Sequence, residues 1–111
     1  MGKERINLEN VDLASFSAQK FYGMKGIGAL IKKESIVIEP LIHGGKSWTK
    51  DRSGTPATAL IVSMAKALRL AYENLDEKIK KVTEYNDYLR KELEKNRITI
   101  NSPKTAIPHI L

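Results

Sequence analysis

The sequence predicts an α/β fold in which a small sheet comes before one or two long helices. Short strand-like runs lie in the first part of the chain, where glycines and a proline separate them. After Thr55, apolar residues instead recur every three or four positions over about forty residues, as they do on one face of a helix. A chain of 111 residues is long enough for one small hydrophobic core, so a single domain is the default expectation.

Three strands are expected in residues 1–45. Residues 11–16 alternate in part between apolar and polar side chains, and residues 26–31 form an apolar run after a glycine-rich turn. A polar turn at 32–35 leads to a β-branched strand at 36–39, which would complete a hairpin. Pro40 and the glycine pair at 44–45 then end the sheet, because neither residue type suits the interior of a strand ladder.

A polar loop at 46–55 precedes a helical segment at 56–96. Threonine can cap a helix and proline is tolerated at its first position, so Thr55-Pro56 predicts the helix start. The segment is longer than most globular helices, and we expect two helices or one helix bent near residues 73–76. Its apolar stripe consists of Leu60, Met64, Leu68, Ala71, Leu75, Ile79, Val82, Leu89 and Leu93.

A coiled coil over residues 75–95 is the alternative to packing on a sheet. Leucine and valine keep a seven-residue step there, but Asn86 interrupts the companion positions and only three heptads are present, so packing on a sheet is favoured. Residues 98–100 then predict a short strand, and the rest of residues 97–111 is expected to be an extended tail.

Composition argues against several classes of function. The net charge is +6, but basic and acidic residues alternate, which favours a solvated mixed surface over a nucleic-acid interface. Cysteine is absent and the two histidines are far apart, which argues against disulfides and against zinc. No apolar run is long enough for a bilayer and the first ten residues do not resemble a secretory signal, so we expect no membrane partner and a cytoplasmic location.

Lys20 is the candidate functional residue, because it lies between a strand and a glycine-rich turn and follows Ser15 and Ser17. Burial at a strand end would favour the free amine that lysine chemistry needs, and hydroxyls could bind a phosphorylated cofactor. Spacing alone still favours an ordinary surface lysine. The glycines at 23, 26 and 28 reverse the order of the dinucleotide-binding fingerprint and are followed by a strand, so a dinucleotide site is rejected.

A family resemblance changes this balance. The segment SFSAQKFYGMKGIGAL at 15–30 resembles the part of the pyridoxal-phosphate-dependent cysteine desulfurases, in the class V aminotransferase group, that holds the Schiff-base lysine. Further matches follow in the same order along the chain, at LIHGG (41–45), RSGTP (52–56), the helix pair and IPHIL (107–111).

The resemblance implies a role for each candidate residue. Lys20 would form the Schiff base with pyridoxal 5'-phosphate and then move protons, while Ser17 and Gln19 would bind the cofactor phosphate. Thr55 would reach that phosphate from the other subunit of a homodimer, and it could cap the helix as well. The sequence departs from the family pattern in three places, with Gln19 for a histidine, Met24 for a proline, and Lys46-Ser47-Trp48 for a Gly-Gln-Glu.

The implied structure is a fragment of the large domain of a pyridoxal-phosphate-dependent transferase, with residues 1–111 as a single partial domain. In it the strand before Lys20 and the 26–31 strand would be parallel, and 36–39 would lie antiparallel at their edge. The implied function is a segment of a cysteine desulfurase, which breaks the C–S bond of cysteine and passes sulfur to an acceptor protein. The isolated chain has no cysteine to receive sulfur and is expected to be incomplete and inactive, with other enzyme segments among its partners. The alternative is a non-catalytic remnant that acts as an oligomerising or interaction module, since a small sheet with exposed edges favours self-association.

Overall fold

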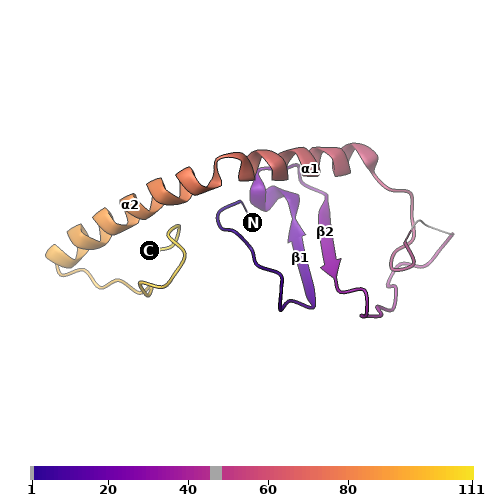
Figure 1. Ribbon diagram of the computed structural model, residues 1–111, viewed down its shortest axis with the longest axis horizontal. Coiled ribbons are helices and arrows are strands. Elements are labelled where there is room, and N and C mark those ends of the chain that lie inside the picture. The colour runs from indigo at the N-terminus through magenta and orange to yellow at the C-terminus, as the bar shows by residue number, and fades with distance from the viewer. Residues whose placement is uncertain (1, 46–48) are drawn as a thin grey trace. The chain divides into compact units, whose positions relative to one another are not determined.

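A computed structural model describes residues 2–45 and 49–111 of the chain. Lys46-Ser47-Trp48, which replace the Gly-Gln-Glu of the resembled family, lie outside the described residues. The elements in chain order are β1 (Leu13–Ser17), η1 (Ala18–Phe21, a 3₁₀ helix), β2 (Gly28–Lys32), α1 (Thr58–Glu73) and α2 (Leu75–Lys95) (Figure 1).

The chain divides into two compact units. One unit is Asn7–Leu68, which holds the sheet, and the other joins the residues up to Ile6 with Arg69–Leu111. The prediction of a single partial domain stays a prediction. No helix among the described residues has both the length and the apolar character that a bilayer span requires.

The sheet has two strands, β1 and β2, which pair antiparallel from Leu13 opposite Lys32 to Ser17 opposite Gly28. The expected parallel arrangement is therefore wrong. A parallel pair needs a crossover of a dozen or more residues, and the connection between these strands is shorter and contains only η1. β2 consequently pairs with the strand before it, and the two arrows point in opposite directions (Figure 1).

The expected third strand at 36–39 is also wrong, because this segment pairs with no strand of the described residues. The Ile36 amide donates a hydrogen bond to the Lys33 carbonyl at 3.1 Å, which closes a turn. Lys32 Nζ then donates to the Ile36 carbonyl at 2.9 Å and lies 3.7 Å from an Asp51 carboxylate oxygen. These contacts hold the segment beside the end of β2 but outside the sheet.

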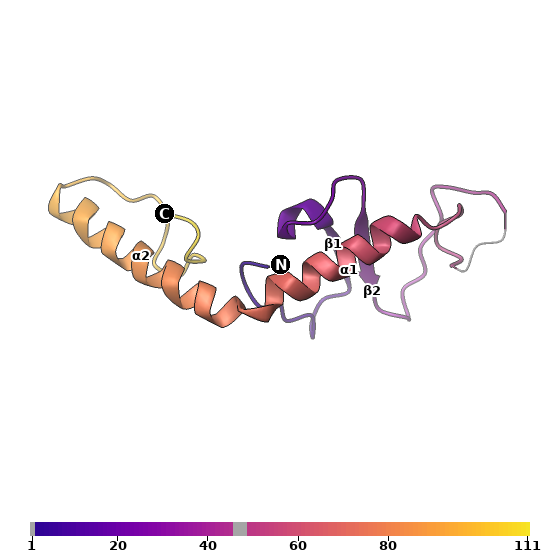
Figure 2. The same cartoon turned by 90° about the horizontal axis from the view of Figure 1, so that it is seen from above.

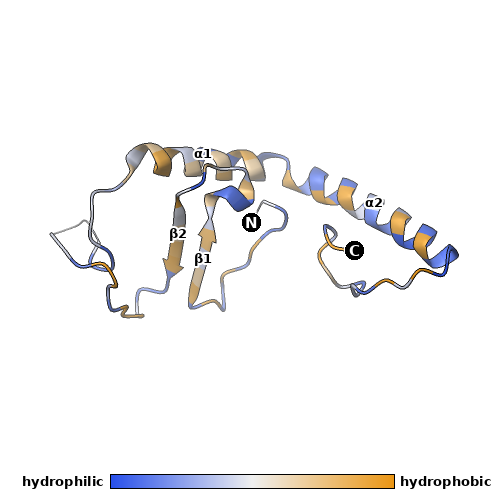
Figure 3. Cartoon of the chain, turned by 180° about the vertical axis from the view of Figure 1, so that it is seen from behind, coloured by the Kyte–Doolittle hydropathy of each residue, from blue (hydrophilic) through white to orange (hydrophobic). Residues whose placement is uncertain are grey.

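The helical segment contains the interruption that the sequence predicts. α1 ends at Glu73 and α2 begins at Leu75, so the expectation of a break within residues 73–76 is confirmed. In the hydropathy view, orange and blue alternate along α2, as an apolar stripe requires, whereas α1 is mostly orange and pale (Figure 3). Ala71 and Leu75, one on each side of the break, are almost completely buried.

The helix start differs from the prediction. α1 begins at Thr58, and the Ile61 amide donates to the Ala57 carbonyl at 3.0 Å. Thr55 lies three residues before Thr58, outside the capping position, so the helix-cap role expected for Thr55 is wrong.

The C-terminal residues do not form the strand expected at 98–100, and instead run back along α2 (Figures 1 and 2). Two side chains of α2 hold them. Asn86 Nδ2 donates to the Pro108 and Ile110 carbonyls at 3.0 and 3.1 Å, and Arg90 donates to Ser102 Oγ at 2.6 Å. The carbonyls of Pro108 and Ile110 thus accept from a helix side chain, whereas in a strand they would accept from a neighbouring strand.

Candidate functional site

The short helix η1 presents Lys20 to the surface. Residues three apart lie on the same side of a 3₁₀ helix, so Ala18 and Phe21 share one face and the two residues between them point elsewhere. Ala18 and Phe21 are both fully buried, whereas Gln19 and Lys20 are exposed. Lys20 is therefore exposed in this structure, as spacing alone favoured, and the buried neighbours act as an anchor beneath the amine.

Backbone hydrogen bonds fix both ends of η1. The Ala18 amide donates to the Ile27 carbonyl at 3.0 Å, which ties the start of η1 to the residue before β2. The Gly23 amide donates to the Ala18 carbonyl at 2.9 Å, and Tyr22 adopts the left-handed conformation, with φ of 68°, at the C-terminal cap. The chain therefore reverses direction immediately after Lys20.

Aromatic packing supports the same turn from β1. The rings of Phe16 and Phe21 meet edge to face, with their centroids 6.1 Å apart and their planes at 62°. This is a favourable geometry for two aromatic rings, and it links the end of β1 to the buried face of η1.

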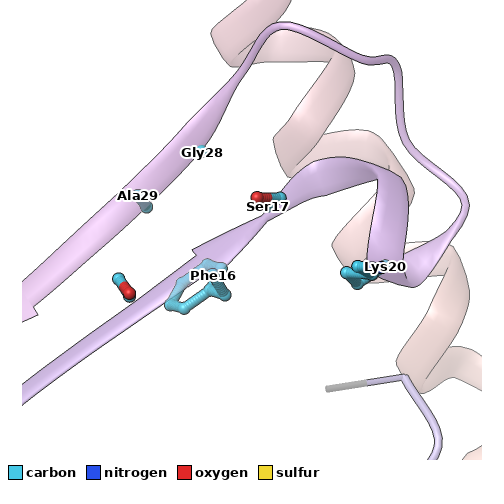
Figure 4. A pocket seen from close by; sticks show the side chains of 6 residues that line it. Phe16, Ser17, Lys20, Gly28 and Ala29 are labelled. Atoms are coloured by element: carbon cyan, nitrogen blue, oxygen red, sulfur yellow. The ribbon is translucent and has the colours of Figure 1, made fainter.

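An open hollow of about 540 Å³ lies beside Lys20. Figure 4 shows its contributors, with Lys20 coming from η1, Phe16 and Ser17 from the end of β1, and Gly28 and Ala29 from β2. Ser17 makes no capping hydrogen bond to η1 through its side chain. The residues that line the hollow are Ser15, Phe16, Ser17, Lys20, Gly28 and Ala29.

The structure brings together some of the predicted site residues and not others. Ser17 and Lys20 line the same hollow, together with Ser15. Gln19 is exposed on η1 but is not part of the lining, and Thr55 is exposed before α1, also outside the lining.

Phe16, Gly28 and Ala29 are lining residues that the sequence did not predict. In the antiparallel register, Gly28 lies opposite Ser17 and Ala29 opposite Phe16. A Cβ on Gly28 would lie 2.8 Å from the Phe16 carbonyl oxygen, so glycine allows the close approach of the two strands there. Only the antiparallel pairing of β1 and β2 identifies these residues as part of the lining, whereas a parallel pairing was expected from the sequence.

The donors around the hollow fit a phosphorylated aldehyde. A lysine amine can bond covalently to an aldehyde carbon, and serine hydroxyls donate hydrogen bonds to phosphate oxygens. Lys20 supplies the amine, while Ser15 and Ser17 supply hydroxyls on the same hollow. The hollow is open, so a ligand of this class could enter it directly.

Comparison with known proteins finds several that are similar to this chain over most of its length. The family model "Aminotransferase class-V" matches residues 1–110. A cysteine desulfurase IscS of Dictyoglomus turgidum is 44% identical over 109 residues, which cover 95% of this chain and 28% of that protein. A cysteine desulfurase IscS of Clostridium botulinum is 42% identical over 97 residues, covering 86% of this chain and 24% of that protein.

A solved structure of a NifS-like protein is similar to this chain with a TM-score of 0.84 and 38% identity, over 96% of this chain and 30% of that one. This likeness confirms the α/β fold class, with two strands in place of the three expected. The chain spans less than a third of the length of each of these relatives. The resemblance first seen around Lys20 is confirmed, and the chain belongs to the class-V aminotransferase family.

Proposed function

We propose that this chain is the lysine-bearing segment of a pyridoxal-phosphate-dependent cysteine desulfurase. The observation that carries the proposal is the shared hollow of Lys20 and Ser17, within a chain that is similar to cysteine desulfurases over nearly its whole length. The activity of the whole enzyme would be cleavage of the C–S bond of cysteine, followed by transfer of the sulfur to an acceptor protein in the cytoplasm.

Each candidate residue has a role in this proposal. Lys20 would hold pyridoxal phosphate covalently through Nζ, and Ser17 would donate its hydroxyl to a phosphate oxygen. Gln19 would reach the phosphate from the exposed side of η1, and Thr55 would reach it from a second subunit. When bound, the cofactor supplies an electron sink for the bonds of the amino-acid substrate. Lys20 Nζ would then take a proton and return it to the substrate.

Sulfur transfer needs a group that this chain does not contain. A thiolate is the residue type suited to accept the sulfur, and the sequence has no cysteine. The accepting thiolate would therefore come from another polypeptide segment or from an acceptor protein, and the chain alone would hold the cofactor without completing the reaction.

Covalent labelling tests the proposal. The chain would be incubated with pyridoxal phosphate, reduced with borohydride, digested and mapped by mass spectrometry. We expect preferred modification of Lys20, and loss of that modified peptide in Lys20→Ala. Lys25→Ala is the matched control, because Lys25 is also exposed but does not line the hollow, and it should leave the labelling of Lys20 unchanged. Label spread evenly over the exposed lysines would contradict the proposal.

A second candidate is an oligomerising or interaction module, and the exposed apolar segment after β2 favours it. Val37 is 86% exposed, Leu41 is 97% exposed and Ile42 is 50% exposed, although their side chains are of the type that normally packs. Self-association would cover them, and a dimer would also bring a second Thr55. Light scattering over a wide concentration range should show dimers or larger species, and a sharp monomer throughout would contradict this candidate.

A further inference from the structure

We infer that Gly23 is a positioning residue for Lys20, because the turn that presents the lysine closes only if residue 23 has no side chain. The inference rests on the proposed function of Lys20. It concerns the backbone behind the lysine, where Gly23 follows η1 and packs directly against Ala18, the first residue of η1.

The available space around Gly23 is too small for a methyl group. A Cβ at this position would lie 2.8 Å from Ala18 Cβ, 3.0 Å from the Ala18 carbonyl oxygen and 3.2 Å from its carbonyl carbon. Carbon atoms in good contact are about 3.5–4.0 Å apart, so one of the two residues would have to move by about 1 Å. Gly23 is not among the residues with positive φ, so the requirement concerns space and not backbone conformation.

The displacement would reach Lys20 because Ala18 cannot move alone. Ala18 is fully buried, and its amide and carbonyl are both engaged, with Ile27 and Gly23 as partners. η1 has only four residues, so a shift of its first residue tilts the whole turn. Lys20 would then leave the hollow that it shares with Ser17.

The primary test compares Gly23→Ala with Gly45→Ala in the full chain. No described atom lies within 4 Å of the place that a methyl group on Gly45 would take, and Gly45 has no positive φ, so its alanine variant is the matched control. After labelling with pyridoxal phosphate and borohydride, the ratio of label on Lys20 to label on the other lysines should fall about tenfold in Gly23→Ala, since a misplacement of about 1 Å can cost up to about 10²-fold. Gly45→Ala should keep the ratio of the wild type, and the same ratio in Gly23→Ala would overturn the inference.

A compensating variant separates positioning from a general loss of structure. Ala18→Gly combined with Gly23→Ala removes the closest contact, at 2.8 Å, and leaves the 3.0 Å contact with the carbonyl oxygen. The double variant should therefore recover part of the Lys20 preference lost in Gly23→Ala. If Gly23→Ala does not fold, the double variant still tests the inference. A double variant that labels Lys20 no better than Gly23→Ala does would count against it.

Hydrogen exchange tests the close contact without the cofactor. The amides of Ala18 and residue 23 should be protected in the wild type, because both donate backbone hydrogen bonds, and should lose protection in Gly23→Ala. Unchanged protection of both amides in that variant would refute the role of Gly23. Absence of any Lys20 preference in the wild type would instead refute the proposed function, so the two failures are distinguishable.

Discussion

Replacing Arg90 with methionine should release the C-terminal segment from α2. The guanidinium of Arg90 donates from Nη1 to the Ser102 carbonyl at 3.1 Å and from Nη2 to Ser102 Oγ at 2.6 Å. It also reaches the Pro103 carbonyl at 3.3 Å and is oriented by Asn86 Oδ1, which accepts from Arg90 Nε at 2.7 Å. Methionine keeps the unbranched stem and the helix propensity but removes all of these donors.

The size of the effect follows from the two partly buried hydrogen bonds to Ser102. A hydrogen bond to a charged group contributes about 1.5–3 kcal/mol, and the lower value suits a site that is only half-buried. The longer bond to Pro103 is exposed and adds little. Loss of both bonds to Ser102 should therefore cost about 3 kcal/mol, which corresponds to a rise of about 10²-fold in the population of the released segment.

Limited trypsin digestion measures that population. Lys104 is exposed and lies between Ser102 and Pro108, two of the residues that α2 holds. Where the segment recloses faster than it is cut, cleavage after Lys104 should accelerate by about 10²-fold in Arg90→Met. Lys91→Met is the matched control, because Lys91 is the neighbouring exposed cation of α2 and makes no hydrogen bond to a described residue. Equal cleavage rates in the two variants would refute the reasoning.

Three further predictions concern other parts of the chain. The hydrogen bonds from Arg5 lower the pKa of Asp76, so the stability that this carboxylate contributes is present above its ordinary pKa and is lost as pH falls through the lowered one. An NMR titration should show the Asp76 pKa rising in Arg5→Gln, and an unchanged pKa would contradict this cause. Leu75→Ala should cost about 2–5 kcal/mol in urea unfolding because Leu75 is 1% exposed, whereas Leu70→Ala, at 45% exposed, should cost much less, and equal costs would contradict the burial argument. The isolated chain should release no more sulfide from cysteine than pyridoxal phosphate alone, and excess release that Lys20→Ala abolishes would contradict this prediction.

The helical half of the fold could be read from the sequence because its signals are local. The apolar stripe from Leu60 to Leu93 predicted the helical segment, and its length of about forty residues predicted an interruption, which the structure places where α1 stops at Glu73 and Asn74 follows. The start of the first helix was placed too early, at Thr55, because a capping residue followed by proline is a weak signal for a helix boundary. In the structure the helical hydrogen bonds begin at the Ala57 carbonyl, which accepts from the Ile61 amide.

The sheet was harder to predict because strand pairing is not local. Ile36-Val37-Ile38 has the residue types of a strand, but a strand forms only where another strand offers its backbone for pairing. In this structure β2 pairs with β1. The error carried over to the site. Lys20 and Ser17 were identified from their own segment, whereas Gly28 enters the hollow through the antiparallel register that the prediction missed.

The 3₁₀ geometry of η1 also limits how the number of residues between Ala18 and Phe21 can change during evolution. With three residues per turn, inserting one residue between Ala18 and Phe21 would rotate everything after it by about 120°. Either the phenylalanine would swing out to water or the lysine would swing inward, and no substitution elsewhere could restore both. Natural variation here should therefore exchange side chains, as at the glutamine before Lys20, and should avoid insertions and deletions between the two buried anchors.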